Sequence, residues 1–471
     1  MSDTHSFVIL QMVSIWAIVV WVFILTARRD GRAPIDDIGF LWLGVFALYS
    51  TLPPLSWLLQ GGSYGPLSGR LFEMQPSTNE IMSLLNIALA YILSFALIYI
   101  VLLRRVGRPV ATAQGHIGGT KIASAAVIVM TSYVIGAAIG NMGLIRSPES
   151  YTDSIKVIAE LPLGLRQFIK TVSSVSSIAT LVLLVAVLQR WPRYRVLFIF
   201  YLLSIMVRID PQGSRAGVVS GLLSIVIAWH VLVRPIPSRR LFVGGVLGLL
   251  VFLALGILRG KESVTGIGDI ELEVVEFGEF DTLWANAVHL WQLRQNGAVD
   301  VPFATRFSEF VAFVPSQLLW FEKSTLAVWY LDTYYPEFRE QGGGLAFGAM
   351  SQAIIGGGMI EAAIRGATFG VIAGWIMMWV RAPSRSWWRF PLHLFILIWV
   401  YQGVRDTTFT LWGSIVQMVL PALVIIGLLG GLLGAMSKVV RTPNDRLRRR
   451  FRPGPPALEG GEISAIPPRT R

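Results

Sequence analysis

The chain has 471 residues, of which 54% are hydrophobic and only 14% are charged, and its mean hydropathy is +0.61. Soluble domains carry about 25% charged residues, so this sequence lacks the polar surface that a globule in water needs, which excludes a soluble enzyme. The net charge of +12 does not indicate nucleic-acid binding, because the basic residues separate apolar runs instead of gathering in one region. Cysteine is absent, which excludes disulfides, thiolate metal sites and a cysteine nucleophile.

Apolar runs that reach or approach the length of a membrane-spanning helix recur along the whole chain. Such a helix needs about 20 mostly apolar residues. The sequence therefore predicts an all-α polytopic membrane protein with about 11 transmembrane helices. The predicted spans are Phe7–Thr26, Ile38–Leu58, Ile81–Leu103, Ile122–Leu144, Phe168–Leu188, Val196–Val207, Gly217–Val233, Leu241–Leu258, Ile360–Val380, Phe390–Gly403 and Phe409–Gly434.

Several glycines within these spans are four residues apart, a spacing typical of membrane helices that pack closely. We expect a structural role for all of them. They are Gly136 with Gly140, Gly244 with Gly248, and Gly366 with Gly370 and Gly374.

Basic residues are distributed unevenly between the two sets of loops. Of the 40 lysines and arginines, 25 follow odd-numbered spans, where only six of the 28 acidic residues lie. Because cytoplasmic loops are rich in Lys and Arg, the N-terminus is expected outside and the C-terminus in the cytoplasm. The first span is not expected to be a cleaved signal, because Asp3 precedes it and Arg28 and Arg29 follow it.

The spans divide the chain into four parts. Residues 1–258 hold spans one to eight, and residues 353–434 hold spans nine to eleven. Between them, residues 259–352 are expected to form one large outward-facing loop domain, and loops of that length usually carry function. Residues 435–471 form a basic tail, rich in Pro and Gly near its end, that is expected to be disordered.

Basic residues also occur at helix junctions on the outward side, where a charge near the bilayer needs a partner. The planar guanidinium group binds phosphate oxygens bidentately, so a diphosphate at the membrane surface is a suitable ligand. The alternative is that these are snorkelling arginines or internal ion pairs, such as Glu361 with Arg365 at i,i+4 spacing. The candidate diphosphate-binding residues are Arg208, Arg215, Arg259, Lys261, Arg306, Lys323, Arg365 and Arg405.

Carboxylates precede a predicted amphipathic helix in the loop domain. Trp284, Val288 and Trp291 give this helix an apolar stripe. A carboxylate or histidine here can remove a proton from a sugar hydroxyl; the alternatives are a solvated acidic surface and a structural histidine. No metal-ligand pattern is present, so neither a metal nor a cofactor is expected. The candidate catalytic residues are Glu279, Asp281, His289 and Glu361.

Short motifs between Val196 and Gly434 resemble those of the O-antigen polymerases of the Wzy type. One departure from the family pattern precedes the ninth span: members often have an acidic residue and Asn-Phe-Gly, whereas this chain has Ile354-Ile355-Gly356-Gly357-Gly358 with Glu361 later. The motifs are Gly213-Ser214-Arg215, Arg259-Gly260-Lys261, Val301-Pro302-Phe303, Phe313-Val314-Pro315, Leu319–Lys323 and Gly343–Gly348 running through Ser351.

This resemblance implies a GT-C-like membrane glycosyltransferase of the bacterial inner membrane, with its active site on the periplasmic face. It would transfer glycan from undecaprenyl diphosphate to the sugar end of another undecaprenyl-diphosphate-linked repeat unit, with membrane lipids and a chain-length regulator as further partners. Two alternatives remain open: an O-antigen ligase or other glycosyltransferase that uses a lipid-linked sugar, and a transporter of lipid-linked sugar or a small anion. The absence of an evident internal repeat argues against a transporter.

Overall fold

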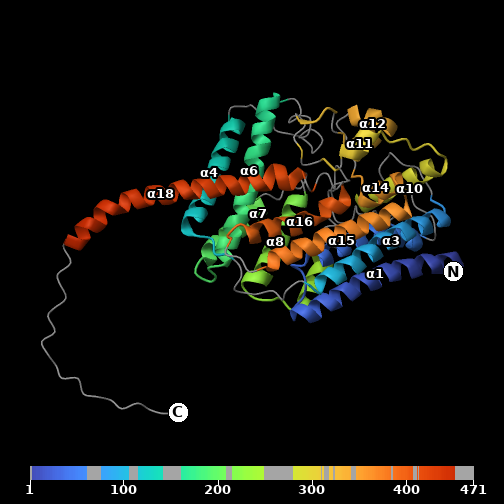
Figure 1. Cartoon of the computed structure of the whole chain (residues 1–471), viewed down its shortest axis with the longest axis horizontal. Helices are drawn as coiled ribbons and strands as arrows, with labels where there is room; N and C mark the ends of the chain where they lie inside the picture. Colours follow the sequence, from blue (N-terminus) through green and yellow to red (C-terminus); the bar gives the residue numbers. More distant parts are fainter. Residues whose placement is uncertain are drawn as a thin grey trace, which may run out of the picture.

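A computed structural model of the chain describes residues 3–60, 76–105, 115–141, 161–207, 215–248, 279–308, 310–311, 314, 318–321, 324–340, 346–382, 386–406, 411 and 413–450. Every regular element in these ranges is a helix (Figure 1). The predicted all-α class is therefore confirmed.

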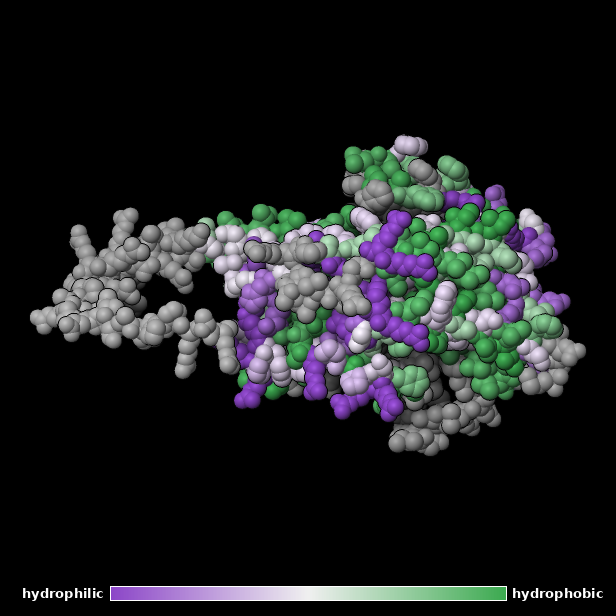
Figure 2. Space-filling model, turned by 60° about the horizontal axis from the view of Figure 1, so that its bottom comes forward, coloured by the Kyte–Doolittle hydropathy of each residue, from purple (hydrophilic) through white to green (hydrophobic). Residues whose placement is uncertain are grey.

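Within the described ranges, six helices are long and apolar enough to cross a membrane. On α1, the exposed side chains include Phe7, Leu10 and Val13, and Figure 2, viewed from the side where α1 lies, shows a broad hydrophobic area with hydrophilic residues gathered beside it. Such a surface matches the hydrocarbon of a bilayer. The six helices are α1 (Asp3–Asp30), α2 (Ile38–Leu59), α3 (Thr78–Leu103), α4 (Gly119–Asn141), α6 (Leu163–Leu188) and α15 (Met359–Arg381).

The other five predicted spans correspond to shorter helices or to helices described only in part. Of the eighth span, Leu241–Leu258, residues 241–248 are described, within a helix over 238–248. The count of eleven spans and the GT-C-like arrangement remain predictions. The other helices are α7 (Arg195–Val207), α8 (Arg215–Leu232), α16 (Arg389–Arg405) and α18 (Leu420–Arg450), the last preceded by a π-helical turn at Ile415–Val419.

Helix α18 packs against α4 and α6, and its C-terminal part extends beyond them (Figure 1). It continues past Gly434, where the last span was expected to end, through Arg450. Residues 435–450, expected to be disordered, are therefore helical in the structure. Five of these sixteen residues are arginine, which favours helix.

Five helices lie in the described part of the predicted loop domain and at its end. The amphipathic helix expected after Glu279 is confirmed as α10, on which Trp284 and Val288 are fully buried. Contacts join α10 to α2, α3 and α14, so this domain packs directly on the membrane helices. The five helices are α10 (Glu279–Gln295), α11 (Phe303–Ser308), α12 (Leu326–Tyr334), α13 (Pro336–Glu340) and α14 (Ala349–Ile355).

Helix α15 lies along α3, and three glycines let the two backbones approach each other. A methyl group on Gly366 would overlap the carbonyl oxygen of Tyr91, and one on Gly370 would lie 2.7 Å from the carbonyl oxygen of Phe95. One on Gly374 would lie 2.8 Å from the side chain of Leu102. The expectation of close packing at these three glycines is confirmed.

The other glycine pairs do not show this packing in the described residues. Gly136, Gly244 and Gly248 have no atom within 4 Å of the position that a Cβ would occupy, and the side chain position of Gly140 lies outside the described part. The expected close packing is therefore wrong for these three within this chain. Their spacing matches that of the α15 glycines, but no helix among the described residues reaches them.

We expect Gly370→Ala to lower the free energy of unfolding by about 1–3 kcal/mol, because the added methyl group pushes α15 away from α3. The measurement is chemical unfolding of the purified protein in detergent micelles. Gly244→Ala is the matched control and should be neutral or slightly stabilising, since alanine favours helix and meets open space. Equal unfolding free energies for the two variants would contradict this account of the α3–α15 contact.

A buried set of charges joins the C-terminal end of α15 to the turn between α1 and α2. Arg381 binds both carboxylate oxygens of Asp30, at 2.6 and 3.0 Å, and its guanidinium lies 3.7 Å from Asp37. Arg29 also binds Asp30, at 2.7 Å. Asp37 begins α2, where its side chain accepts a hydrogen bond from the backbone N–H of Phe40. We call Arg29, Asp30, Asp37 and Arg381 the Arg381 cluster.

The Arg381 cluster brings together chain segments that are far apart in sequence. Arg29 also donates to the carbonyl oxygen of Leu103, the last residue of α3, at 3.1 Å. His393, near the start of α16, lies 2.9 Å from the carbonyl oxygen of Asp36 through its Nε2. Residues that follow the first, third and ninth predicted spans therefore meet at one end of the molecule.

We expect Arg381→Gln or Asp30→Asn alone to destabilise the protein by about 3–5 kcal/mol, because each leaves a buried charge without its main partner. The double variant should be less unstable than the sum of the two single variants, as measured by unfolding in detergent. The pair Asp332 and Arg339, at 3.4 Å and about half exposed, is the control and should contribute at most about 1 kcal/mol. Additive effects of the Arg381 and Asp30 changes would contradict a direct interaction.

Candidate functional site

A second set of charges lies at the opposite end of α15. Glu361 is in the first turn of this helix, 20 residues before Arg381, so the two charged ends are about 30 Å apart along the helix, close to the hydrocarbon thickness of a bilayer. Side chains from α10, α11, α14 and α15 contribute to this second set. We call Arg294, Arg306, Gln352, Glu361 and Arg365 the Glu361 cluster.

The carboxylate of Glu361 accepts hydrogen bonds from Arg306, from Arg365 and from the backbone. Arg365 lies one helical turn away and binds Oε1 through Nε at 2.9 Å and Nη2 at 2.8 Å. Arg306, on α11, reaches Oε2 at 3.3 Å. The backbone N–H of Gly357 donates to Oε2 at 2.8 Å. A carboxylate at a helix N-terminus is also favoured by the helix dipole.

Three glycines shape the turn from α14 into α15 so that this ion pair fits. Gly358 has a φ of 62°, a conformation that glycine adopts without strain. A Cβ on Gly356 would overlap the Glu361 carboxylate and lie 2.6 Å from Nη2 of Arg306. Arg294 holds the other side of the turn by donating to the carbonyl oxygens of Ile354 and Gly356.

Gln352 connects the Glu361 cluster to the end of α16. Its side chain is 1% exposed, accepts from Nη1 of Arg365 at 3.1 Å and donates to the carbonyl oxygen of Asp406 at 3.0 Å. Arg405, the last residue of α16, donates to the side chain of Gln402 at 3.3 Å. The predicted arginine Arg405 therefore directly precedes the residue whose carbonyl oxygen Gln352 contacts.

The Glu361 cluster carries three arginines and one carboxylate. Arg365 and Glu361 are 17% and 21% exposed, and Arg306 is 44% exposed, so the cluster is open to solvent on the α11 side. The excess of guanidinium groups produces a positive potential at this end of α15. Its chemistry suits an anion with several oxygens, such as a phosphate or diphosphate.

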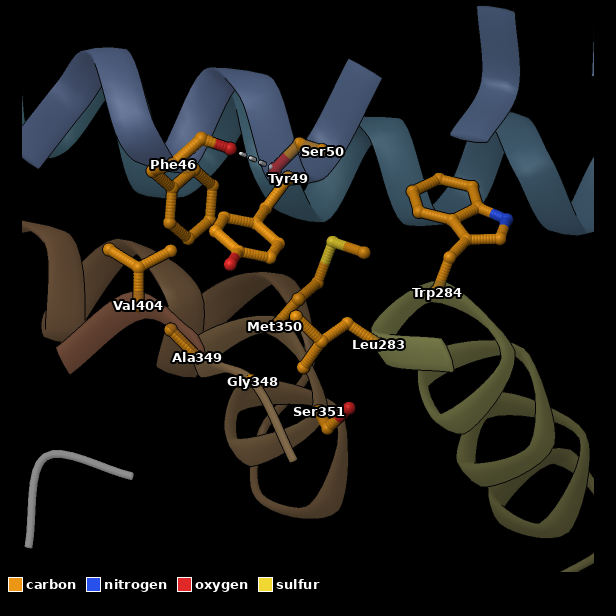
Figure 3. A pocket seen from close by; sticks show the side chains of 10 residues that line it. All are labelled: Phe46, Tyr49, Ser50, Leu283, Trp284, Gly348, Ala349, Met350, Ser351 and Val404. Carbon is orange, nitrogen blue, oxygen red and sulfur yellow. Dashed lines mark hydrogen bonds between the residues drawn. The ribbon is translucent and has the colours of Figure 1, made fainter. Parts of the chain in front are cut away.

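A small, mainly apolar pocket lies beside the cluster, between α2, α10, α14 and α16. Figure 3 shows Phe46 and Tyr49 of α2 facing the segment that holds Met350, with Leu283 and Trp284 of α10 at its side. Two buried polar atoms of the lining, Trp284 Nε1 and Ser351 Oγ, have no hydrogen-bond partner in the described residues. The complete lining is Phe46, Tyr49, Ser50, Leu283, Trp284, Gly348, Ala349, Met350, Ser351 and Val404.

Residues next to the lining carry polar groups that sequence analysis singled out. Asp281 is two residues before Leu283 and is only 6% exposed, so it is not part of a solvated acidic surface. Along α10 it precedes Arg294 by 13 residues, or about 20 Å, so it lies near the start of this helix, two residues from the lining, and not in the Glu361 cluster. Arg405 follows the lining residue Val404. Glu279 begins α10, but its side chain lies outside the described part.

His289 lies in an aromatic group that joins α10 to α12. Its Nδ1 is 2.7 Å from the hydroxyl oxygen of Tyr330 and 3.2 Å from that of Tyr335. Burial lowers the pKa of His289 and raises the pKa of Tyr330, so both groups are neutral at neutral pH. These contacts give His289 a structural role in the loop domain.

The structure thus brings part of the predicted anion site together. Of the eight basic residues proposed from sequence, Arg306 and Arg365 join the Glu361 cluster, and Arg405 precedes Asp406, whose carbonyl oxygen accepts from Gln352. Arg215 begins α8, but its side chain is outside the described part. The remaining four residues, Arg208, Arg259, Lys261 and Lys323, are also outside the described residues.

Sequence analysis missed two members of the cluster. Arg294 is in the last turn of α10, where a basic residue is expected simply to interact with the helix dipole. Gln352 has no charge and follows no motif that indicates a site. Their roles follow from the approach of α10 and α14 in space, which no local pattern encodes.

Comparison with known proteins gives no assignment. No known protein family, no curated protein and no solved structure matches this chain. The argument for function therefore rests on the chemistry of the Glu361 cluster and its adjoining pocket.

Proposed function

We propose that the protein is a membrane glycosyltransferase that polymerises oligosaccharide repeat units carried on undecaprenyl diphosphate. The observation that supports this most directly is that two arginines bind one carboxylate at one end of α15, while a third, Arg294, binds the backbone of the adjacent turn. The chain itself is rich in helices of membrane-spanning length. A site for a polyvalent anion at a membrane boundary fits a lipid-linked diphosphate. The choice of reaction comes from the resemblance of the sequence motifs to those of the O-antigen polymerases.

The arginines have a defined role in this reaction. When the bond between the sugar and the diphosphate breaks, negative charge grows on the leaving diphosphate, and fixed guanidinium groups stabilise that charge. Arg306 and Arg365 already bind the carboxylate oxygens of Glu361, at 3.3 and 2.8 Å. Since arginine stays protonated in proteins, this stabilisation needs no proton transfer.

The orientation of the site follows from the distribution of basic residues. The Arg381 cluster belongs to segments expected in the cytoplasm, and Glu361 lies about 30 Å away on α15. We therefore assign the Glu361 cluster to the periplasmic face of the bacterial inner membrane. This is the face on which lipid-linked repeat units of the resembling family are joined.

The pocket beside the cluster suits the acceptor sugar. Tyr49, which is half-buried, can present its ring to a sugar at the edge of the pocket, whereas Phe46, Trp284 and Ser351 are at most 2% exposed and line its closed part. An acceptor hydroxyl oxygen attacks the anomeric carbon of the donor, and its proton passes to Asp281. The bond from that carbon to the diphosphate oxygen breaks, and undecaprenyl diphosphate leaves with the electron pair.

The experiment that tests the proposal supplies the purified protein, in lipid, with the lipid-linked repeat unit as both donor and acceptor. Polymer on the lipid carrier is the result expected. A ligase uses the same donor but would join the glycan only to an added lipid A core. A protein that releases no undecaprenyl diphosphate with either acceptor would contradict a glycosyltransferase.

We expect Arg365→Lys and Arg306→Lys each to reduce polymer formation by roughly 10- to 100-fold, since lysine keeps the charge but loses the bidentate contact. The assay measures release of undecaprenyl diphosphate under saturating donor. Arg339→Lys is the matched control, because Arg339 is about half exposed and pairs with Asp332 on α12. Full activity in both cluster variants would remove the arginines from the mechanism.

If Asp281 is the base, Asp281→Asn should reduce turnover by roughly 100-fold or more while the donor still binds. The exposed Asp300 serves as control, and Asp300→Asn should leave turnover unchanged. Donor affinity is measured separately by isothermal titration, which separates loss of chemistry from loss of binding. Wild-type turnover in Asp281→Asn would transfer the role to Glu279, the neighbouring candidate.

A further inference from the structure

Two arginines of the Glu361 cluster, Arg306 and Arg365, bind a carboxylate of the protein itself, that of Glu361. Arg365 contacts one oxygen of Glu361 through two nitrogens, and Arg306 contacts the other oxygen. Carboxylate and phosphate oxygens are bound by guanidinium groups through the same charge-assisted hydrogen bonds. In the structure, Glu361 therefore stands where oxygens of a bound anion would otherwise contact these arginines.

We propose that Glu361 is an internal competitor for the anion site, which a diphosphate ligand must displace from Arg306 and Arg365. The inference rests on the proposed function, because it takes the arginines as the diphosphate site. It assigns Glu361 a part in selecting ligands, in place of the catalytic role considered from sequence. Affinity for every anion is reduced by the cost of separating these ion pairs.

The surroundings of Glu361 allow its displacement without leaving it unpartnered. The backbone N–H of Gly357 donates to it at 2.8 Å, and its place in the first turn of α15 provides the positive end of the helix dipole. Both interactions come from backbone and persist when the arginines turn to another anion. The carboxylate therefore keeps part of its stabilisation in the ligand-bound state.

The two arginines differ in how readily they can exchange partners. Arg365 is also held by Gln352 and is 17% exposed, whereas Arg306 is 44% exposed and its contact with Glu361 is longer, at 3.3 Å. Arg306 comes from α11 and its partner from α15. Exchange at Arg306 thus replaces a contact between the loop domain and a membrane helix with a contact to the ligand.

The test measures binding of inorganic pyrophosphate to the full-length protein in detergent by isothermal titration at low salt. Glu361→Gln removes the charge but keeps the size and an oxygen that can accept from Gly357. We expect its Kd to be roughly 3- to 30-fold lower than that of the wild type, corresponding to the loss of two competing ion pairs. The control is Asp332→Asn, which removes a carboxylate from the exposed pair with Arg339 and should leave the Kd unchanged.

Each outcome separates this inference from the proposed function. Pyrophosphate binding that is equal or weaker in Glu361→Gln, in a variant that unfolds at the same temperature as the wild type, would overturn the competitor role and leave the anion site intact. If the variant unfolds earlier, Glu361→Asp replaces it: the shorter side chain contacts the arginines less closely, and tighter binding is again expected. Binding to the variant alone would support competition, whereas no binding to wild type or variants would overturn both the anion site and its competitor.

Discussion

The close contact between α3 and α15 fixes the position of both charged clusters. Because Gly366 and Gly370 bring the α15 backbone against that of α3, α15 cannot shift along its axis without new overlaps. Glu361 and Arg381, near the two ends of this helix, are held at a fixed separation of about 30 Å. The residues that join Arg381 in its cluster lie on α1 and at the start of α2. Those that join Glu361 from outside α15 lie on α10, α11 and α14.

The two clusters solve the problem of charge near a bilayer in different ways. The Arg381 cluster pairs two arginines with two aspartates, and Arg381, Asp30 and Asp37 are at most 4% exposed. Such a balanced, closed network has a structural role. The Glu361 cluster has three arginines for one carboxylate and remains partly exposed. Its unbalanced charge is the physical reason to assign the ligand to this end of α15 and not to the other.

The sequence predicted those features that depend on local pattern. Apolar length identified the spans that became α1, α2, α3 and α15, and the stripe of Trp284 and Val288 identified α10. Helical spacing also predicted the pair of Glu361 and Arg365. Local pattern could not predict contacts between distant segments: Arg381 and Asp30 are 351 residues apart in sequence, and Arg306 and Glu361 are 55 residues apart. The same limit applies to glycines, since identical spacing is close-packed at Gly366 and open at Gly244.

The separation between Asp281 and the Glu361 cluster constrains how a donor can lie in the proposed site. The reacting carbon is bonded directly to the diphosphate, so the phosphate next to the sugar must lie near the pocket, on the side of Gln352 and Arg405. The second phosphate then points toward Arg306 and the first turn of α15. There Ile360 and Ile364 are 72% and 61% exposed, which provides an apolar surface beside which a polyprenyl chain can enter the bilayer. Competition by Glu361 at Arg306 would act at this second phosphate, whereas competition at Arg365, which also binds Gln352, would act nearer the bond that breaks.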